Sequence, residues 1–160
     1  NLLVYHSLSK RSNLPGLRSG FVAGDPALIA RFNKVRSYGG APTPLPIDAV
    51  ATAAWSDETH VEANRALYRE KFDIAEQILG PTFGYKRPDG GFFVWLEVGD
   101  SESACLALWK EVGIRTIPGA YFAYDREDGS NPGAAYLRLA LVDDRDMIEH
   151  ALTRIVEVLG

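Results

Sequence analysis

Residues 7–20 read SLSKRSNLPGLRSG, and they lie between two short apolar stretches of the chain. Residues 2–5 are predicted to form a strand, and residues 6–16 the loop that carries Lys10. Residues 19–24 are predicted to form a second strand, small and apolar enough to be covered on both faces. A lysine is therefore expected just past the end of a strand, in a loop that leads into the next strand.

The side chains of this loop suit the binding of a phosphorylated aldehyde. A lysine in a partly desolvated pocket, or beside another cation, loses its proton more readily and can form a Schiff base. Arg11 and Arg18 are candidates for that neighbouring charge, and the donor fork of Arg18 also suits a phosphate. The Ser7 hydroxyl is a further candidate phosphate contact. These residues predict a seat for pyridoxal 5'-phosphate (PLP), and the simpler alternative is a solvated surface loop rich in Ser, Lys and Arg.

The rest of the chain alternates predicted helices and strands, which indicates an α/β protein. Asp25 is expected to cap a helix, and Thr59 and Glu62 to form a capping box that opens a long one. Gly80-Pro81 is expected to end that long helix, and Asp143 to cap the last helix. The other expected elements are a helix at 47–55, a strand at 92–98, a helix ended by Gly113, strands at 114–117 and 136–142, and loops at 38–46 and 124–134.

Composition excludes several classes of function. The formal net charge is −4 and no basic block stands out, which argues against nucleic acid as a partner. Cys105 is the only cysteine, so no internal disulfide is expected and a reducing compartment, the cytoplasm, is predicted. No apolar run approaches the length of a membrane span, and no His/Cys spacing suggests a metal site.

Arg138 stands in the middle of a predicted strand, YLRLAL at residues 136–141. Leu137, Leu139 and Leu141 share one face of that strand, so Arg138 points to the other. An arginine there is costly to bury unless it meets an anion, and a bidentate carboxylate would satisfy it. The alternatives are an ion pair with a nearby Asp or Glu, or a solvated face of the sheet.

Residues 7–20, the run GGFFVWL at 90–96 and the late arginine together resemble the class I/II aminotransferases, which are PLP-dependent enzymes of fold type I. The resemblance implies that Lys10 holds the cofactor covalently, that Ser7 and Arg18 bind its phosphate, and that Arg138 binds the substrate's α-carboxylate. It implies that residues 1–56 are the end of the PLP-binding large domain. Residues 57–160 would be the small C-terminal α/β domain with a bridging helix.

Finer features are similar to those of one group in this family, the succinyldiaminopimelate aminotransferases of bacterial lysine biosynthesis. The similar stretches are SKRSNLPGLRSGF at 9–21, AWSDETHV at 54–61, YREKF at 68–72, PGAY at 118–121 and NPG at 131–133. The resemblance implies amino transfer between glutamate and N-succinyl-2-amino-6-oxopimelate. Gly39-Gly40, where a His-Gly pair is expected, and the loop at 124–130 depart from the pattern, so the reaction is better supported than the substrate.

The chain opens inside a predicted strand and without methionine, which suggests the C-terminal part of a longer protein. The resemblance places other cofactor contacts in preceding sequence, so these 160 residues alone are expected to bind PLP poorly and not to transaminate. The family implies a homodimer acting on small amino and oxo acids. A carbon–sulfur lyase of the same fold type, or a non-catalytic regulatory module built on an aminotransferase-like domain, remain alternatives.

Overall fold

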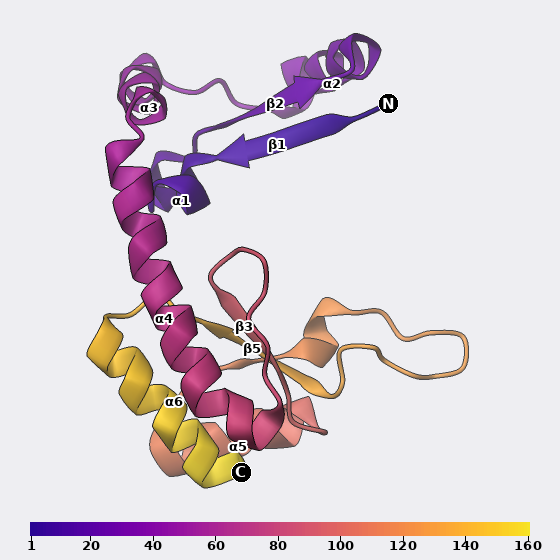
Figure 1. Cartoon of the computed structure of the whole chain (residues 1–160). Coiled ribbons are helices and arrows are strands. Elements are labelled where there is room, and N and C mark those ends of the chain that lie inside the picture. The colour runs from indigo at the N-terminus through magenta and orange to yellow at the C-terminus, as the bar shows by residue number, and fades with distance from the viewer. The chain divides into compact units, whose positions relative to one another are not determined.

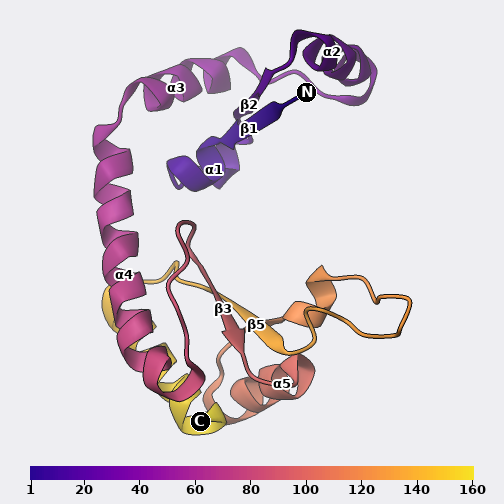
Figure 2. The same ribbon diagram turned by 45° about the vertical axis from the view of Figure 1, so that its right-hand side comes forward.

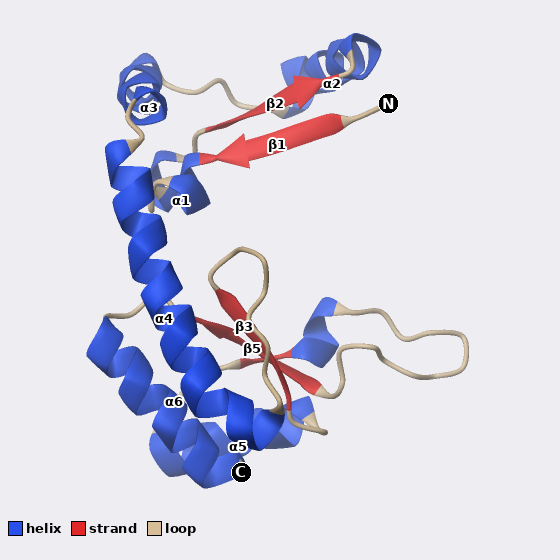
Figure 3. Cartoon of the chain, in the orientation of Figure 1, coloured by secondary structure: helices blue, strands red, loops and turns tan.

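The computed structural model describes residues 1–160, which fold into two compact units, Asn1–Arg65 and Ala66–Gly160 (Figure 1). Helices and strands alternate along the chain, and the predicted α/β fold is confirmed (Figure 3). None of the helices has the length and apolar character needed to cross a bilayer.

In the first unit, a two-stranded antiparallel sheet holds the segment that contains the lysine. Strand β1 (Leu3–Ser7) pairs with β2 (Gly20–Gly24), with Ser7 opposite Gly20. The segment between them is not the open loop that the sequence suggests. It forms a helical turn, α1 (Leu8–Arg11), followed by a 3-10 turn, η1 (Pro15–Leu17). Lys10 therefore lies on a helical turn that begins directly at the end of β1.

The expectation that β2 is covered on both faces is wrong for this chain. Most residues of both strands are exposed, including Tyr5 and Phe21. The physical reason is that the sheet has only two strands, which helix α2 (Pro26–Gly39) and the ring of Trp55 cover only in part.

The two helices that follow agree with the sequence pattern, with shifted ends. Asp25 caps α2 as predicted, because its Oδ1 accepts the N–H groups of Ala27 and Leu28 at 2.9 and 3.1 Å. This helix continues to Gly39, and α3 (Leu45–Ser56) begins earlier than expected. The predicted loop at 38–46 is therefore shorter than the glycines and prolines suggest.

The long helix α4 (Thr59–Phe83) differs from the prediction at both ends. Thr59 is already helical, and its N–H donates to Asp57 Oδ1 at 2.9 Å. The side chain that accepts an N–H at the N-terminus of α4 is therefore that of Asp57 and not that of Thr59. The helix also continues past Gly80-Pro81. Proline removes only its own N–H from the ladder, and the Gly84 N–H still donates to the Gly80 carbonyl at 2.9 Å.

The second unit packs helices on one face of a three-stranded antiparallel sheet, ordered β3 (Phe93–Glu97), β5 (Tyr136–Ala140), β4 (Ile117–Pro118). Helices α4, α5 (Ser101–Val112) and α6 (Arg145–Leu159) supply the other side chains of the core. The buried cluster contains Phe72, Ala75, Leu79, Val94, Leu96, Leu108, Leu137, Leu139, Leu141, Ile148, Leu152 and Ile155. The loop between η2 (Gly119–Phe122) and β5 projects from this unit (Figure 2).

Three predictions in this unit hold only approximately. Strand β4 covers Ile117–Pro118 and not the full stretch 114–117. Strand β5 ends at Ala140, and the last helix is capped by Asp144, one residue later than predicted. The Asp144 Oδ1 accepts the Met147 N–H at 2.8 Å, because an Asx cap reaches the N–H three residues on. The glycine stop at Gly113 is confirmed by its left-handed φ of 69°.

Candidate functional site

Lys10 is positioned by a capped turn at the end of β1. The Ser7 Oγ accepts the Ser9 N–H at 3.1 Å, which is the capping bond of α1, and donates to the Ser19 carbonyl at 3.3 Å. Leu8 is fully buried and its N–H donates to the same Ser19 carbonyl at 3.2 Å. The turn is thus fixed at its start by both strands, while Lys10 itself is exposed.

Arg18 lies at the end of η1, just before β2. Its φ of 51° places it in the left-handed region, and its Nη1 donates to the Pro15 carbonyl at 3.0 Å. The residue is exposed, and Nε and Nη2 are left for a ligand. An exposed amine and an exposed guanidinium are the kinds of group that react with an aldehyde and bind a phosphate, respectively. The Ser7 hydroxyl fits less directly, because it already bonds to Ser19.

Arg11 serves a different purpose from the neighbouring charge that the sequence suggests. Its side chain is only 11% exposed and is ion-paired with Glu58. Its Nη1 donates to the Ala54 carbonyl at 2.9 Å, and the guanidinium lies 4.9 Å from the centre of the Trp55 ring. With its charge balanced by Glu58, Arg11 anchors the end of α1 to the α3–α4 junction.

His60, at the start of α4, connects the turn that carries Lys10 to that helix. Its Nε2 is 2.9 Å from Ser12 Oγ and its Nδ1 is 2.7 Å from Asp57 Oδ2. The bond with His60 and the N–H of Thr59 lower the pKa of Asp57 from 3.8 to about 2. Sequence reasoning did not find this contact, because it depends on the burial of Ser12, which only the folded chain shows.

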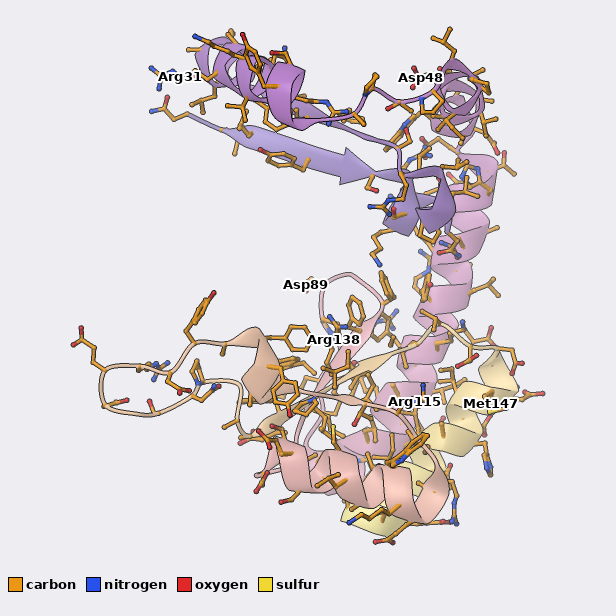
Figure 4. All side chains as sticks on the ribbon, turned by 180° about the vertical axis from the view of Figure 1, so that it is seen from behind. Arg31, Asp48, Asp89, Arg115, Arg138 and Met147 are labelled. Atoms are coloured by element: carbon orange, nitrogen blue, oxygen red, sulfur yellow. The ribbon has the colours of Figure 1, made fainter.

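Arg138 lies in the second unit, on the face of β5 away from the helices (Figure 4). The predicted division of faces is confirmed, because Leu137, Leu139 and Leu141 are buried in the core. The guanidinium carbon lies 4.6 Å from the centre of the Phe93 ring and 4.3 Å from that of Phe122.

The chemistry left to Arg138 follows from those neighbours. No carboxylate of the chain is within ion-pair distance of it, so the alternative of a structural ion pair is excluded for this structure. Aromatic faces attract the cation but offer its N–H groups no strong acceptor, so these donors remain able to hold a carboxylate. The sequence argument had identified the arginine without its two aromatic neighbours.

Other reactive groups do not form a site. Cys105 is a free thiol whose Sγ is 2.8 Å from Thr116 Oγ1, and burial raises its pKa, which makes it a poor nucleophile. No group of three or more His, Cys, Asp or Glu side chains has the arrangement of a metal site.

The model of the aminotransferase class I and II family matches residues 1–155. The chain belongs to this family. Its members are PLP-dependent transferases. Ser7, Lys10 and Arg18 lie in the first unit of this aminotransferase chain, and Arg138 lies in the second.

Individual relatives match almost the whole of this chain but a smaller part of their own length. The chain is 36% identical to 4-dedimethylamino-4-oxo-anhydrotetracycline transaminase OxyQ of Streptomyces rimosus, over 96% of this chain and 41% of the relative. It is 27% identical to an LL-diaminopimelate aminotransferase of Nitratidesulfovibrio vulgaris, over 98% of this chain and 40% of the relative. A crystal structure of an aminotransferase from Neisseria meningitidis is 45% identical with a TM-score of 0.92, over 99% of this chain and 41% of that one.

Proposed function

We propose that the complete protein is a PLP-dependent aminotransferase in which Lys10 binds the cofactor, Arg18 and Ser7 bind its phosphate, and Arg138 binds the substrate carboxylate. The observation that carries the proposal is the placement of Lys10. It is exposed on a capped turn directly after β1, within a segment that matches the aminotransferase family. PLP would serve as the electron sink that makes the substrate's α-proton acidic.

Each residue has a defined task in this proposal. The Lys10 Nζ would hold the cofactor, and as a free amine it would move the proton to and from the substrate's α-carbon. The Arg18 guanidinium would donate to the phosphate of the cofactor and hold it in place. Arg138 does the same for the α-carboxylate, which sets the orientation of the α-carbon.

The finer proposal is that the amino group passes between glutamate and N-succinyl-2-amino-6-oxopimelate. It is supported by the stretches at 9–21 and 54–61, which are similar to those of succinyldiaminopimelate aminotransferases. LL-diaminopimelate aminotransferases are among the relatives, and their named substrate is also a pimelate derivative. The relative named as a 4-dedimethylamino-4-oxo-anhydrotetracycline transaminase makes that 4-oxo compound the second acceptor to test.

The test of cofactor binding uses the complete protein with PLP, borohydride and peptide mass spectrometry. A phosphopyridoxyl group is expected on the peptide that contains Lys10, and it should be absent after Lys10→Ala. The matched control is Lys34→Ala, because Lys34 is exposed on α2 and outside the proposed site. Modification that persists in Lys10→Ala at another single lysine would overturn the proposal.

Product analysis then separates transfer from elimination. An aminotransferase releases a new amino acid and an oxo acid, whereas a carbon–sulfur lyase releases ammonia and pyruvate. With glutamate as donor, Lys10→Ala is expected to lower kcat by about a thousandfold, in the range of general acid–base catalysis. Light scattering on the same sample tests the proposed homodimer.

A further inference from the structure

The three residues that follow Lys10 all bind one other segment of the first unit. Arg11 contacts Ala54 and Glu58 as described, and Asn13 Nδ2 donates to Asn64 Oδ1 at 2.8 Å. Between them, Ser12 is only 8% exposed and reaches His60. The stretches SKRSN and AWSDETHV, which carry the resemblance to one group of aminotransferases, therefore contact each other directly.

The hydrogen bonds around Ser12 can form a continuous series in which each group donates to the next, from Arg11 to Asp57. Arg11 Nη1 donates to Ser12 Oγ at 3.3 Å, so the oxygen is already an acceptor and its own proton is available to His60 Nε2. His60 can then donate from Nδ1 to the Asp57 carboxylate. Asp57 also accepts the N–H of Thr59, the first residue of α4, so this series of hydrogen bonds connects to the backbone of that helix.

We propose that His60 is a positioning residue for Lys10. Ser12 is the C-cap residue of α1. By bonding to Ser12, His60 holds the turn that carries Lys10 against the start of α4. This inference rests on the proposed role of Lys10. A fixed turn delivers the amine to the same place in every cycle, and small displacements of a catalytic group cost rate steeply.

The Ser–His–Asp order does not make Ser12 a nucleophile. The serine is buried, its oxygen already accepts from Arg11, and it lies at the end of a turn that its own N–H closes on Leu8. A nucleophilic serine needs an oxygen that a substrate can reach, and the buried Ser12 does not offer one. The constellation holds a backbone in place.

The first test measures hydrogen exchange in the complete protein without PLP, comparing His60→Ala, Ser12→Ala and the double variant with wild type. The N–H groups of Ser12 and Leu14 donate to the Leu8 carbonyl at 3.0 and 3.2 Å, so they report on the turn. Loss of the bond is expected to speed their exchange about fivefold. The double variant should match the single variants, because all three break the same contact.

The matched control is His150→Ala, since His150 is exposed on α6 in the second unit and should leave residues 8–14 unchanged. Unchanged exchange in His60→Ala, or effects of the two single variants that simply add, would overturn the inference.

The second test uses the same variants with PLP restored. His60→Ala should lower kcat about tenfold with KM for the amino donor unchanged, because Arg138 is not part of this network. A change in KM alone would overturn the positioning role. If the wild-type protein were not modified at Lys10 by PLP and borohydride, the proposed function would be overturned. The hydrogen-exchange result would still test the contact between His60 and the turn independently.

Discussion

The guanidinium carbon of Arg138 lies 4.3 Å from the centre of the Phe122 ring, although Phe122 is in η2 and Arg138 in β5. Phe93, on the neighbouring strand β3, contacts the same guanidinium. An arginine without a carboxylate partner is thus held by two aromatic rings on the sheet face away from the core. This arrangement orients the cation without consuming its hydrogen-bond donors.

Arg138→Lys is expected to raise KM for the amino donor about 10- to 100-fold in the complete protein, because lysine keeps the charge but loses the bidentate fork. The control is Arg115→Lys, since Arg115 also lies over an aromatic ring, 4.7 Å from the centre of Trp109, but is exposed elsewhere in the second unit. Steady-state kinetics measure both. Equal KM values in the two variants would show that Arg138 does not bind substrate.

Phe122→Leu tests whether the ring orients the guanidinium. The ring is 50% exposed, so stability should change little, whereas the lost cation–π contact should raise KM for the amino donor about threefold. Combining it with Arg138→Lys should add almost nothing, because the ring acts through that arginine. Additive effects on KM would mean that Phe122 contacts the substrate by itself.

Gly133→Ala is expected to destabilise the protein by about 1 to 3 kcal/mol, since overpacking forces the backbone to move. A Cβ at Gly133 would lie 2.1 Å from the Gly119 carbonyl oxygen, and one at Gly119 would lie 2.4 Å from that of Gly133. Gly90→Ala is the control, because a Cβ there meets nothing within 4 Å. Urea unfolding compares the two, and equal stability would contradict the close approach of these backbones.

That close approach also explains part of the sequence pattern. The runs PGAY and NPG were recognised only as similar to those of relatives, and the structure shows that their glycines face each other. Periodicity predicted the element types and the two faces of β5 because burial repeats along a strand. It could not predict that distant glycines meet, since that depends on how η2 returns to β5.

The candidate site shows the same limit. Lys10 was identified from its local neighbours, because its chemistry needs only nearby residues in the chain. The contacts of Arg11 and His60 were not predicted, since both join segments that are far apart in the sequence and meet only at the α3–α4 junction. Helix starts were misplaced at Thr59 and Asp143 because several neighbouring Asp or Thr side chains can cap, and tertiary packing selects among them.

Asp57→Asn is expected to change how stability depends on pH. The bond with His60, followed by the N–H of Thr59, lowers the pKa of Asp57 from 3.8 to about 2 in the folded protein, so its ionised form favours folding. That contribution is fully present above the unfolded pKa and is lost as the pH falls through the folded one. The difference in unfolding free energy between wild type and Asp57→Asn should therefore be constant above about pH 5 and shrink between about pH 4 and pH 2.

Urea unfolding at a series of pH values measures that difference for Asp57→Asn and for a control, Asp89→Asn. Asp89 is exposed in the loop before β3 and is far in sequence from the His60 network, so its substitution controls for the removal of a surface carboxylate. The sign matters, because a carboxylate with a raised pKa would give the opposite slope. A difference for Asp57→Asn that stays constant down to about pH 2 would show that the carboxylate gains nothing from His60 and would remove the acidic end of the proposed network.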